Sequence, residues 1–131
     1  EARAINNAMS MALDGAPATI RIIAGDFNLV GTRPPLDLAR ADLDFDGSDL
    51  AVAEPRMLGD SLLATWWDEE SPFSPGRLDY MVYSDSTADV VNAFVFDTWK
   101  FTDEAVARMG LDRSDSSASD HLPIVVDLRP R

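Results

Sequence analysis

The sequence predicts a layered α/β domain, and two observations carry this prediction. Apolar residues at helical spacing occupy residues 2–13, and a β-branched apolar run with the character of a buried strand follows at residues 19–24. Further strand patterns lie at residues 78–84, 90–96 and 124–128. A helix that leads into a buried strand packs its apolar side against a sheet, which is the layered arrangement of α/β proteins.

Composition sets broad limits. The chain has 131 residues, which fits one domain or a piece of one, and 46% of them are hydrophobic, enough to build a core. The absence of cysteine excludes disulfides and thiolate metal sites. No apolar run approaches the ~20 residues of a membrane span. Glu1 opens directly into a helical pattern without a signal peptide, so we expect the native start to be missing; secreted and periplasmic locations stay open.

The first half of the chain contains one long helix and few other regular elements. Gly15 and Pro17 are expected to end the helix over residues 2–13. Residues 29–60 are rich in glycine and proline and predict irregular structure, with a short helix over residues 36–41. Residues 62–66 are expected to form a short strand before a loop.

The second half has clearer strand patterns. The five residues between 78–84 and 90–96 predict a hairpin. Thr102 is expected to cap a short helix that Gly110 ends, and residues 112–119 are expected to form a loop. Residues 124–128 predict the last strand, followed by a three-residue tail.

Polar residues gather at three strand boundaries. Gly25-Asp26-Phe27-Asn28 ends an apolar run, Arg77-Leu78-Asp79-Tyr80 begins one, and Ser119-Asp120-His121-Leu122-Pro123 places the single histidine just before another. Because side chains alternate along a strand, Asp26 and Asn28 are expected to point the same way. A carboxylate beside an amide can hold a water, a metal ion or a phosphate.

These three motifs, in this order, resemble the C-terminal half of the endonuclease/exonuclease/phosphatase superfamily, which includes exonuclease III and pancreatic deoxyribonuclease. The resemblance covers about residues 2–129. It implies half of a four-layer α-β-β-α sandwich with a mostly antiparallel or mixed sheet. Residues 1–131 would then form a single unit, the C-terminal part of the domain. The open face of its sheet would need cover from the N-terminal half or from self-association.

The resemblance also implies roles for particular residues. Asp26 would orient and deprotonate a water, Asn28 would hold the water or a phosphate oxygen, and His121 would donate to the scissile phosphate. Asp79 would fix the tautomer of His121 and raise its pKa. Asp26, Asn28 and Asp120 would bind Mg²⁺ or Mn²⁺, cations that prefer oxygen ligands.

The function expected from these roles is divalent-metal-dependent phosphoester hydrolysis. The family's principal metal-binding glutamate belongs to its N-terminal half and has no counterpart here, so the isolated chain is expected to be a weak catalyst. The alternative is a catalytically inactive binding or interaction module that keeps the fold. The substrate class, whether nucleic acid, phospholipid head group or small phosphate, stays open.

Charge and aromatic residues bear on the substrate. The net charge of −12, from 23 acidic and 11 basic residues, repels polyanions and argues against long duplex DNA. Arg77, Trp66 and Trp67 are candidates for substrate contact. The two tryptophans begin the loop before the Arg-Leu-Asp-Tyr strand, which in the resembling family often borders the substrate cleft, and Arg77 opens that strand. The two tryptophans fit cover of the core edge equally well.

Residues 42–48 match the opening of a calcium-binding loop, with acids at alternate positions and then glycine. Asp42, Asp44 and Asp46 are therefore candidate Ca²⁺ ligands. The bidentate glutamate of such a loop is missing, because its position holds Ala53. An exposed acidic turn is the favoured interpretation.

Overall fold

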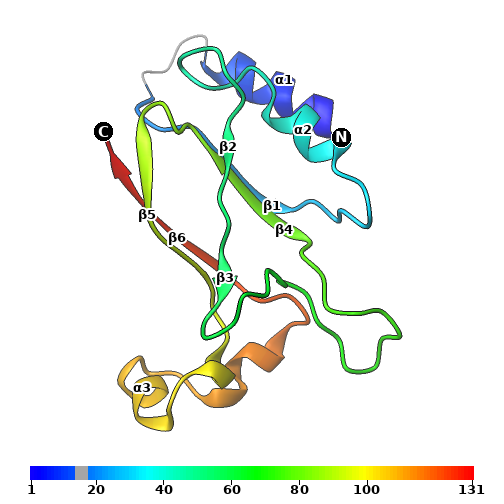
Figure 1. Ribbon diagram of the computed structural model, residues 1–131, viewed down its shortest axis with the longest axis vertical. Helices are drawn as coiled ribbons and strands as arrows, with labels where there is room; N and C mark the ends of the chain where they lie inside the picture. Colours follow the sequence, from blue (N-terminus) through cyan, green and yellow to red (C-terminus); the bar gives the residue numbers. More distant parts are fainter. Residues whose placement is uncertain (14–17) are drawn as a thin grey trace.

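The computed structural model describes residues 1–13 and 18–131, which form two three-stranded sheets and several helices (Figure 1). The first sheet has the order β1-β4-β2, formed by β1 (Ile22–Asp26), β4 (Asp79–Tyr83) and β2 (Ala51–Val52). The second has the order β3-β5-β6, formed by β3 (Arg56–Met57), β5 (Ala88–Val95) and β6 (Ile124–Pro130). All pairs are antiparallel except β3 with β5, so the predicted α/β fold with mixed sheets is confirmed.

Two helices cover one face of the first sheet. Helix α1 (Ala2–Leu13) and helix α2 (Pro34–Arg40) lie beside each other (Figure 1), and the Asn6 side chain donates to the Ala41 carbonyl at 2.9 Å. Both predicted helices are confirmed, although α2 begins two residues earlier than expected, because Pro34 fits the first turn of a helix. The predicted stop at Gly15 and Pro17 lies outside the described residues. The core beneath the helices is formed by the buried residues Leu36, Leu43, Leu50 and Val82.

The last helix, α3 (Asp103–Arg108), begins where the sequence predicts. The Thr102 hydroxyl accepts a hydrogen bond from the Ala105 amide, and Gly110 follows the helix with a φ of +73°, a conformation that glycine adopts without strain. Short 3₁₀ helices stand on either side, η1 (Thr98–Lys100) and η2 (Arg113–Ala118). The second of these occupies most of the expected loop over residues 112–119.

The predicted hairpin is wrong. Strands β4 and β5 do not pair, because β4 lies in the first sheet between β1 and β2 while β5 lies in the second between β3 and β6. The chain changes sheets at a turn in which the Ala88 amide donates to the Ser84 carbonyl, and both residues are fully buried. Two consecutive apolar strands can be buried equally well by different partners, so their spacing alone does not decide the pairing.

Other boundaries also differ from the prediction. Residues 62–66 form no strand, and only Trp66 makes isolated bridges, to Gly76 and His121. The stretch expected to be irregular contains β2 and β3, whose two-residue length leaves no periodic signal. Strand β1 begins at Ile22 rather than at residue 19, and β6 includes two residues of the expected tail.

The side chains of β1 alternate between two faces of the first sheet. Ile23 and Phe27 pack against the core under the helices. Ile22, Ala24 and Asp26 are exposed, which is consistent with the alternation along a strand. Asp26 therefore lies on the face that the helices leave uncovered. None of the helices in residues 1–13 and 18–131 is long and apolar enough to cross a membrane.

Candidate active site

The three polar motifs meet where the two sheets adjoin. Asp26 at the end of β1 is the register partner of Asp79 at the start of β4. His121 precedes β6 of the second sheet and forms an isolated bridge with Trp66. Residues that are up to 95 positions apart in the sequence, from Asp26 to His121 (121 − 26), therefore converge on one place in the fold.

Asp79 and His121 form a hydrogen-bonded pair. Asp79 Oδ2 lies 2.9 Å from His121 Nδ1. A carboxylate only accepts, so Nδ1 carries the proton and Nε2 is left for another partner. The hydrogen bond to Asp79 raises the pKa of His121, against the opposing effect of burial, and the charges of Asp79, Asp26 and Asp120 raise it further. The pair therefore favours the protonated imidazole.

Asp26 and Asn28 form a second, local unit. The Asn28 amide N–H donates to Asp26 Oδ1 at 2.8 Å, and Asn28 Nδ2 donates to Asp26 Oδ2 at 2.7 Å. Asn28 has left the strand and adopts a φ of +49°, a conformation that asparagine tolerates better than most residues. The two side chains do lie together, but a turn after the strand brings this about rather than strand alternation.

One cluster of candidate metal ligands forms among the described residues. Ligand atoms of Asp26, Asp79 and His121 all lie within 4.8 Å of one another. This set differs from the expected one of Asp26, Asn28 and Asp120, since Asp120 is not a member. Asp120 Oδ2 accepts a hydrogen bond from Trp66 Nε1 at 2.8 Å, and this bond is the main reason why the pKa of Asp120 is lowered.

The polar residues line a cleft of about 640 Å³. Asp26, Asn28, Asp120 and His121 all border it. Its aromatic and basic wall is formed by Trp66, Phe73 and Arg77. Trp67 was also predicted to contact the substrate, but it is not among the described residues that line this cleft. Phe73 was missed, although its position between two prolines in an exposed loop was a usable signal.

Thr65 is a positioning residue that the sequence did not reveal. It is fully buried, and its hydroxyl accepts hydrogen bonds from the amides of Leu78, at 3.1 Å, and Asp79, at 3.0 Å. Its carbonyl accepts from the Leu122 amide at 2.7 Å. Thr65 therefore ties the start of β4 to the segment that carries His121.

Replacing Thr65 by valine is expected to lower the free energy of unfolding by about 1–3 kcal/mol, because two amides lose a buried acceptor at constant side-chain shape. Urea denaturation measures this loss of stability. In the same variant, the imidazole resonances of the single histidine should shift relative to the wild type. The exposed Thr19→Val serves as the matched control. Equal stability of the two variants would contradict the role assigned to Thr65.

The acidic stretch around residues 42–48 forms a capped turn. The buried carboxylate of Asp44 accepts hydrogen bonds from the Phe45 amide and from the amide and hydroxyl of Ser86. Asp46 accepts from the Ser48 amide at 2.9 Å. Within the described part of the chain, this stretch does not bring three candidate ligand atoms together. The geometry favours the acidic turn over a Ca²⁺ loop.

Comparison with known proteins adds one match. The model of the family described as "Endonuclease/Exonuclease/phosphatase family" matches residues 1–121, a range that includes the first two motifs and the third as far as His121. Neither the comparison with curated proteins nor that with solved structures gives a match.

Proposed function

The chain belongs to the endonuclease/exonuclease/phosphatase family, and on this premise we propose that it hydrolyses phosphoester bonds with the help of a divalent cation. Members of the family are generally hydrolases of such bonds. The observation that carries the proposal is the convergence of Asp26, Asp79 and His121, from both sheets, within 4.8 Å. Phosphoester hydrolysis needs an oriented water, a donor for the phosphate and a neutraliser of charge, and these groups can supply the first two.

His121 is the proposed donor to the phosphate. With Nδ1 held by Asp79, Nε2–H is free to donate to a phosphate oxygen or to the leaving oxygen. The raised pKa of His121 favours the protonated imidazole, the form that carries this proton. Asp79 acts through His121 by fixing its tautomer and ring orientation, the role of the orienting carboxylate in other acid–base pairs.

Asp26 is the proposed base that orients the attacking water. Both of its oxygens accept hydrogen bonds from Asn28, which orients the carboxylate at the border of the cleft. An oriented carboxylate at a strand end can accept a proton from water as the water attacks phosphorus. Asn28 then has its side-chain oxygen for a further contact with water or phosphate.

The donor set fits Mg²⁺ or Mn²⁺. The cleft offers the carboxylate oxygens of Asp26 and Asp120 and the amide oxygen of Asn28, and hard divalent cations prefer such ligands. We assign these three residues to the metal, with Asp26 as the principal ligand because it also lies next to Asp79 and His121. When bound, the cation supplies positive charge against the phosphate.

A calorimetric titration tests this assignment. Mn²⁺ is expected to bind weakly to the wild-type chain, and Asp120→Ala is expected to weaken binding further because an oxygen ligand is lost. Asp46→Asn, in the acidic turn, is the control and should bind like the wild type. Loss of binding in Asp46→Asn together with unchanged binding in Asp120→Ala would place the metal in the turn instead.

The charge of the chain favours a small substrate. A net charge of −12 opposes the approach of a long polyanion, whereas a short phosphoester meets mainly the cleft. Trp66, Phe73 and Arg77 line this cleft beside the polar residues. We propose that they contact the group attached to the phosphate.

A further inference from the structure

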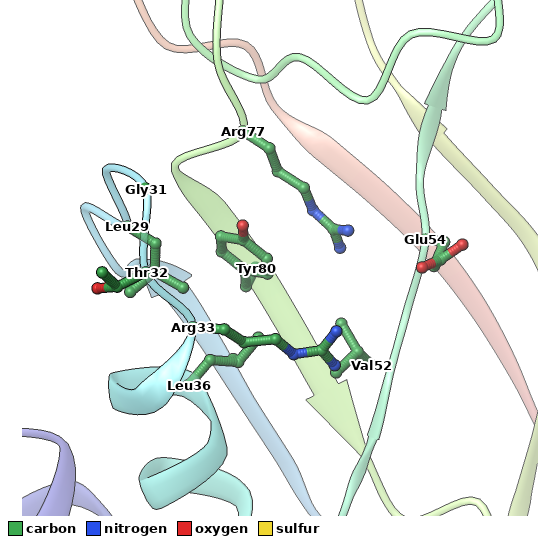
Figure 2. A pocket seen from close by; sticks show the side chains of 9 residues that line it. All are labelled: Leu29, Gly31, Thr32, Arg33, Leu36, Val52, Glu54, Arg77 and Tyr80. Carbon is green, nitrogen blue, oxygen red and sulfur yellow. The ribbon is translucent and has the colours of Figure 1, made fainter.

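A second pocket, of about 320 Å³, adjoins the cleft. It shares Leu29, Gly31 and Arg77 with the cleft, so the two hollows are neighbours. Figure 2 shows the guanidinium groups of Arg33 and Arg77 pointing into this pocket, between α2 and the strand that carries Val52. The hydrolytic roles proposed above belong to other residues, and Arg77 has been given only a contact with the group attached to the phosphate.

Arg77 lines this pocket and is held by two contacts. Its guanidinium carbon lies 4.3 Å from the centre of the Tyr80 ring, and Nη2 donates to the Ala53 carbonyl. Its Nε is buried without a hydrogen-bond partner among the described residues. Among residues 1–13 and 18–131, no carboxylate oxygen lies within 4.0 Å of a guanidinium nitrogen of Arg77. Its positive charge is therefore available to a ligand in the pocket.

Arg33 brings a second positive charge to the same space. Its only described carboxylate partner within 4.0 Å is Asp37, at 3.3 Å, in an exposed pair of the kind that contributes little. Asp37 is also shared with Arg40, at 3.4 Å. Burial is the main cause that lowers the pKa of Arg77; Tyr80 and Glu54 act in the opposite direction, and the nearby charge of Arg33 lowers the pKa. A bound anion would relieve this repulsion.

The balance of charge in the pocket is positive in a strongly acidic chain. Its lining contains two arginines and one acid, Glu54, whose carboxylate stands across the pocket in Figure 2. Planar guanidinium groups recognise phosphate oxygens in pairs, and arginine is better suited than lysine to such contacts. The pocket is therefore locally positive, although the chain as a whole carries a net charge of −12.

We propose that Arg33 and Arg77 form a subsite for a second phosphate group of the substrate. The ligand would be a phosphoester with a further phosphate monoester on the same molecule, so that one phosphate reaches His121 while the other occupies the pocket. The substrate part of this inference rests on the proposed phosphoesterase function. The anion site itself does not, since it uses residues outside the Asp79–His121 pair.

Direct binding tests the anion site without hydrolysis. Inorganic phosphate is titrated into ¹⁵N-labelled chain in the presence of EDTA, at ionic strength held constant with sodium chloride. The Arg77 Nε–H resonance and the Tyr80 amide are expected to shift with saturation. Arg33→Gln should weaken this binding by about tenfold, the size of one charge-assisted contact. Arg108→Gln, an exposed arginine in α3, is the matched control and should bind like the wild type.

Kinetics test whether the bound anion is part of the substrate. Two nitrophenyl phosphodiesters are compared, one with a terminal phosphate monoester on its alcohol and one with a terminal hydroxyl. The wild type is expected to prefer the phosphorylated diester by about tenfold in kcat/KM through a lower KM, and Arg33→Gln should lose this preference. Arg108→Gln should keep it.

The outcomes separate this inference from the proposed function. The anion site is overturned if phosphate shifts neither resonance in the wild type. It is also overturned if phosphate shifts both resonances in Arg33→Gln as much as in the wild type. Phosphate that binds as expected while the wild type shows no preference between the diesters overturns the substrate subsite and identifies a site for free phosphate. If neither diester is hydrolysed, the proposed phosphoesterase function and this substrate role fail together, whereas the titration still decides the anion site.

Discussion

His121→Ala is expected to lower hydrolysis of a nitrophenyl phosphodiester by about 10²–10⁴-fold, the usual contribution of a positioned acid or base. His121 is the only histidine of the chain, so no second imidazole can take its place. Its ring borders the cleft and is held by Asp79 at 2.9 Å. Steady-state kinetics with Mg²⁺ or Mn²⁺ measure the loss, which should fall on kcat.

A variant on the opposite side of the molecule controls for general effects. Asn7→Ala changes an exposed residue of α1, on the helical side of the first sheet, and should keep the wild-type rate. Circular dichroism of His121→Ala should match that of the wild type, because the histidine side chain is partly exposed. A His121→Ala rate within about twofold of the wild-type rate would remove histidine from the chemistry.

Asp79→Asn is expected to lower the rate by about 10²-fold or more at neutral pH, because the amide no longer orients His121 or stabilises its charge. The pKa of His121 should fall in this variant, since the hydrogen bond that the imidazole donates to Asp79 is the largest cause that raises it. NMR titration of the single imidazole measures the change directly. An unchanged His121 pKa in Asp79→Asn would contradict the pairing.

The same pair makes stability depend on pH, with a defined sign. A pKa that is higher in the folded than in the unfolded chain means that folding favours the protonated imidazole. The stabilisation is therefore fully present below the unfolded value of about 6.5 and is lost as the pH rises through the folded pKa. Urea midpoints measured across this window should fall with rising pH in the wild type and change less in Asp79→Asn.

The elements that the sequence predicted well carry strong local signals. Helix α1 has a clear helical period, and α3 has the hydroxyl of Thr102 at its start and Gly110 after its end. Strand β4 is a compact apolar run bounded by Asp79. In each case the deciding interaction lies within a few residues of the chain, so local physics was sufficient.

Sheet pairing could not be predicted in the same way. The choice between a hairpin and two separate sheets depends on partners such as β1 and β6, which are distant in sequence from β4 and β5. Strands β2 and β3 contain two residues each, too few to show a period. Their formation depends on the neighbours β4 and β5, which offer backbone groups for pairing.

Parts of the candidate site were also beyond local reasoning. The contact of Asp79 with His121 was expected, because both residues stand at strand boundaries in a family pattern. The hydrogen bond between Trp66 and Asp120 was not expected, because the two residues are 54 positions apart and share no motif. Thr65 looks like an ordinary residue of an apolar stretch, and only its burial beneath the amide of Asp79 reveals its role.

The metal dependence of hydrolysis tests the central claim most directly. Wild-type chain would be freed of metal with EDTA, dialysed, and assayed with bis-nitrophenyl phosphate, first without metal and then with Mg²⁺ or Mn²⁺. The account predicts no turnover above background without metal, turnover when either cation is added, and loss of that turnover in Asp26→Asn. Turnover that is equal with and without the cations, or that persists in Asp26→Asn, would contradict it.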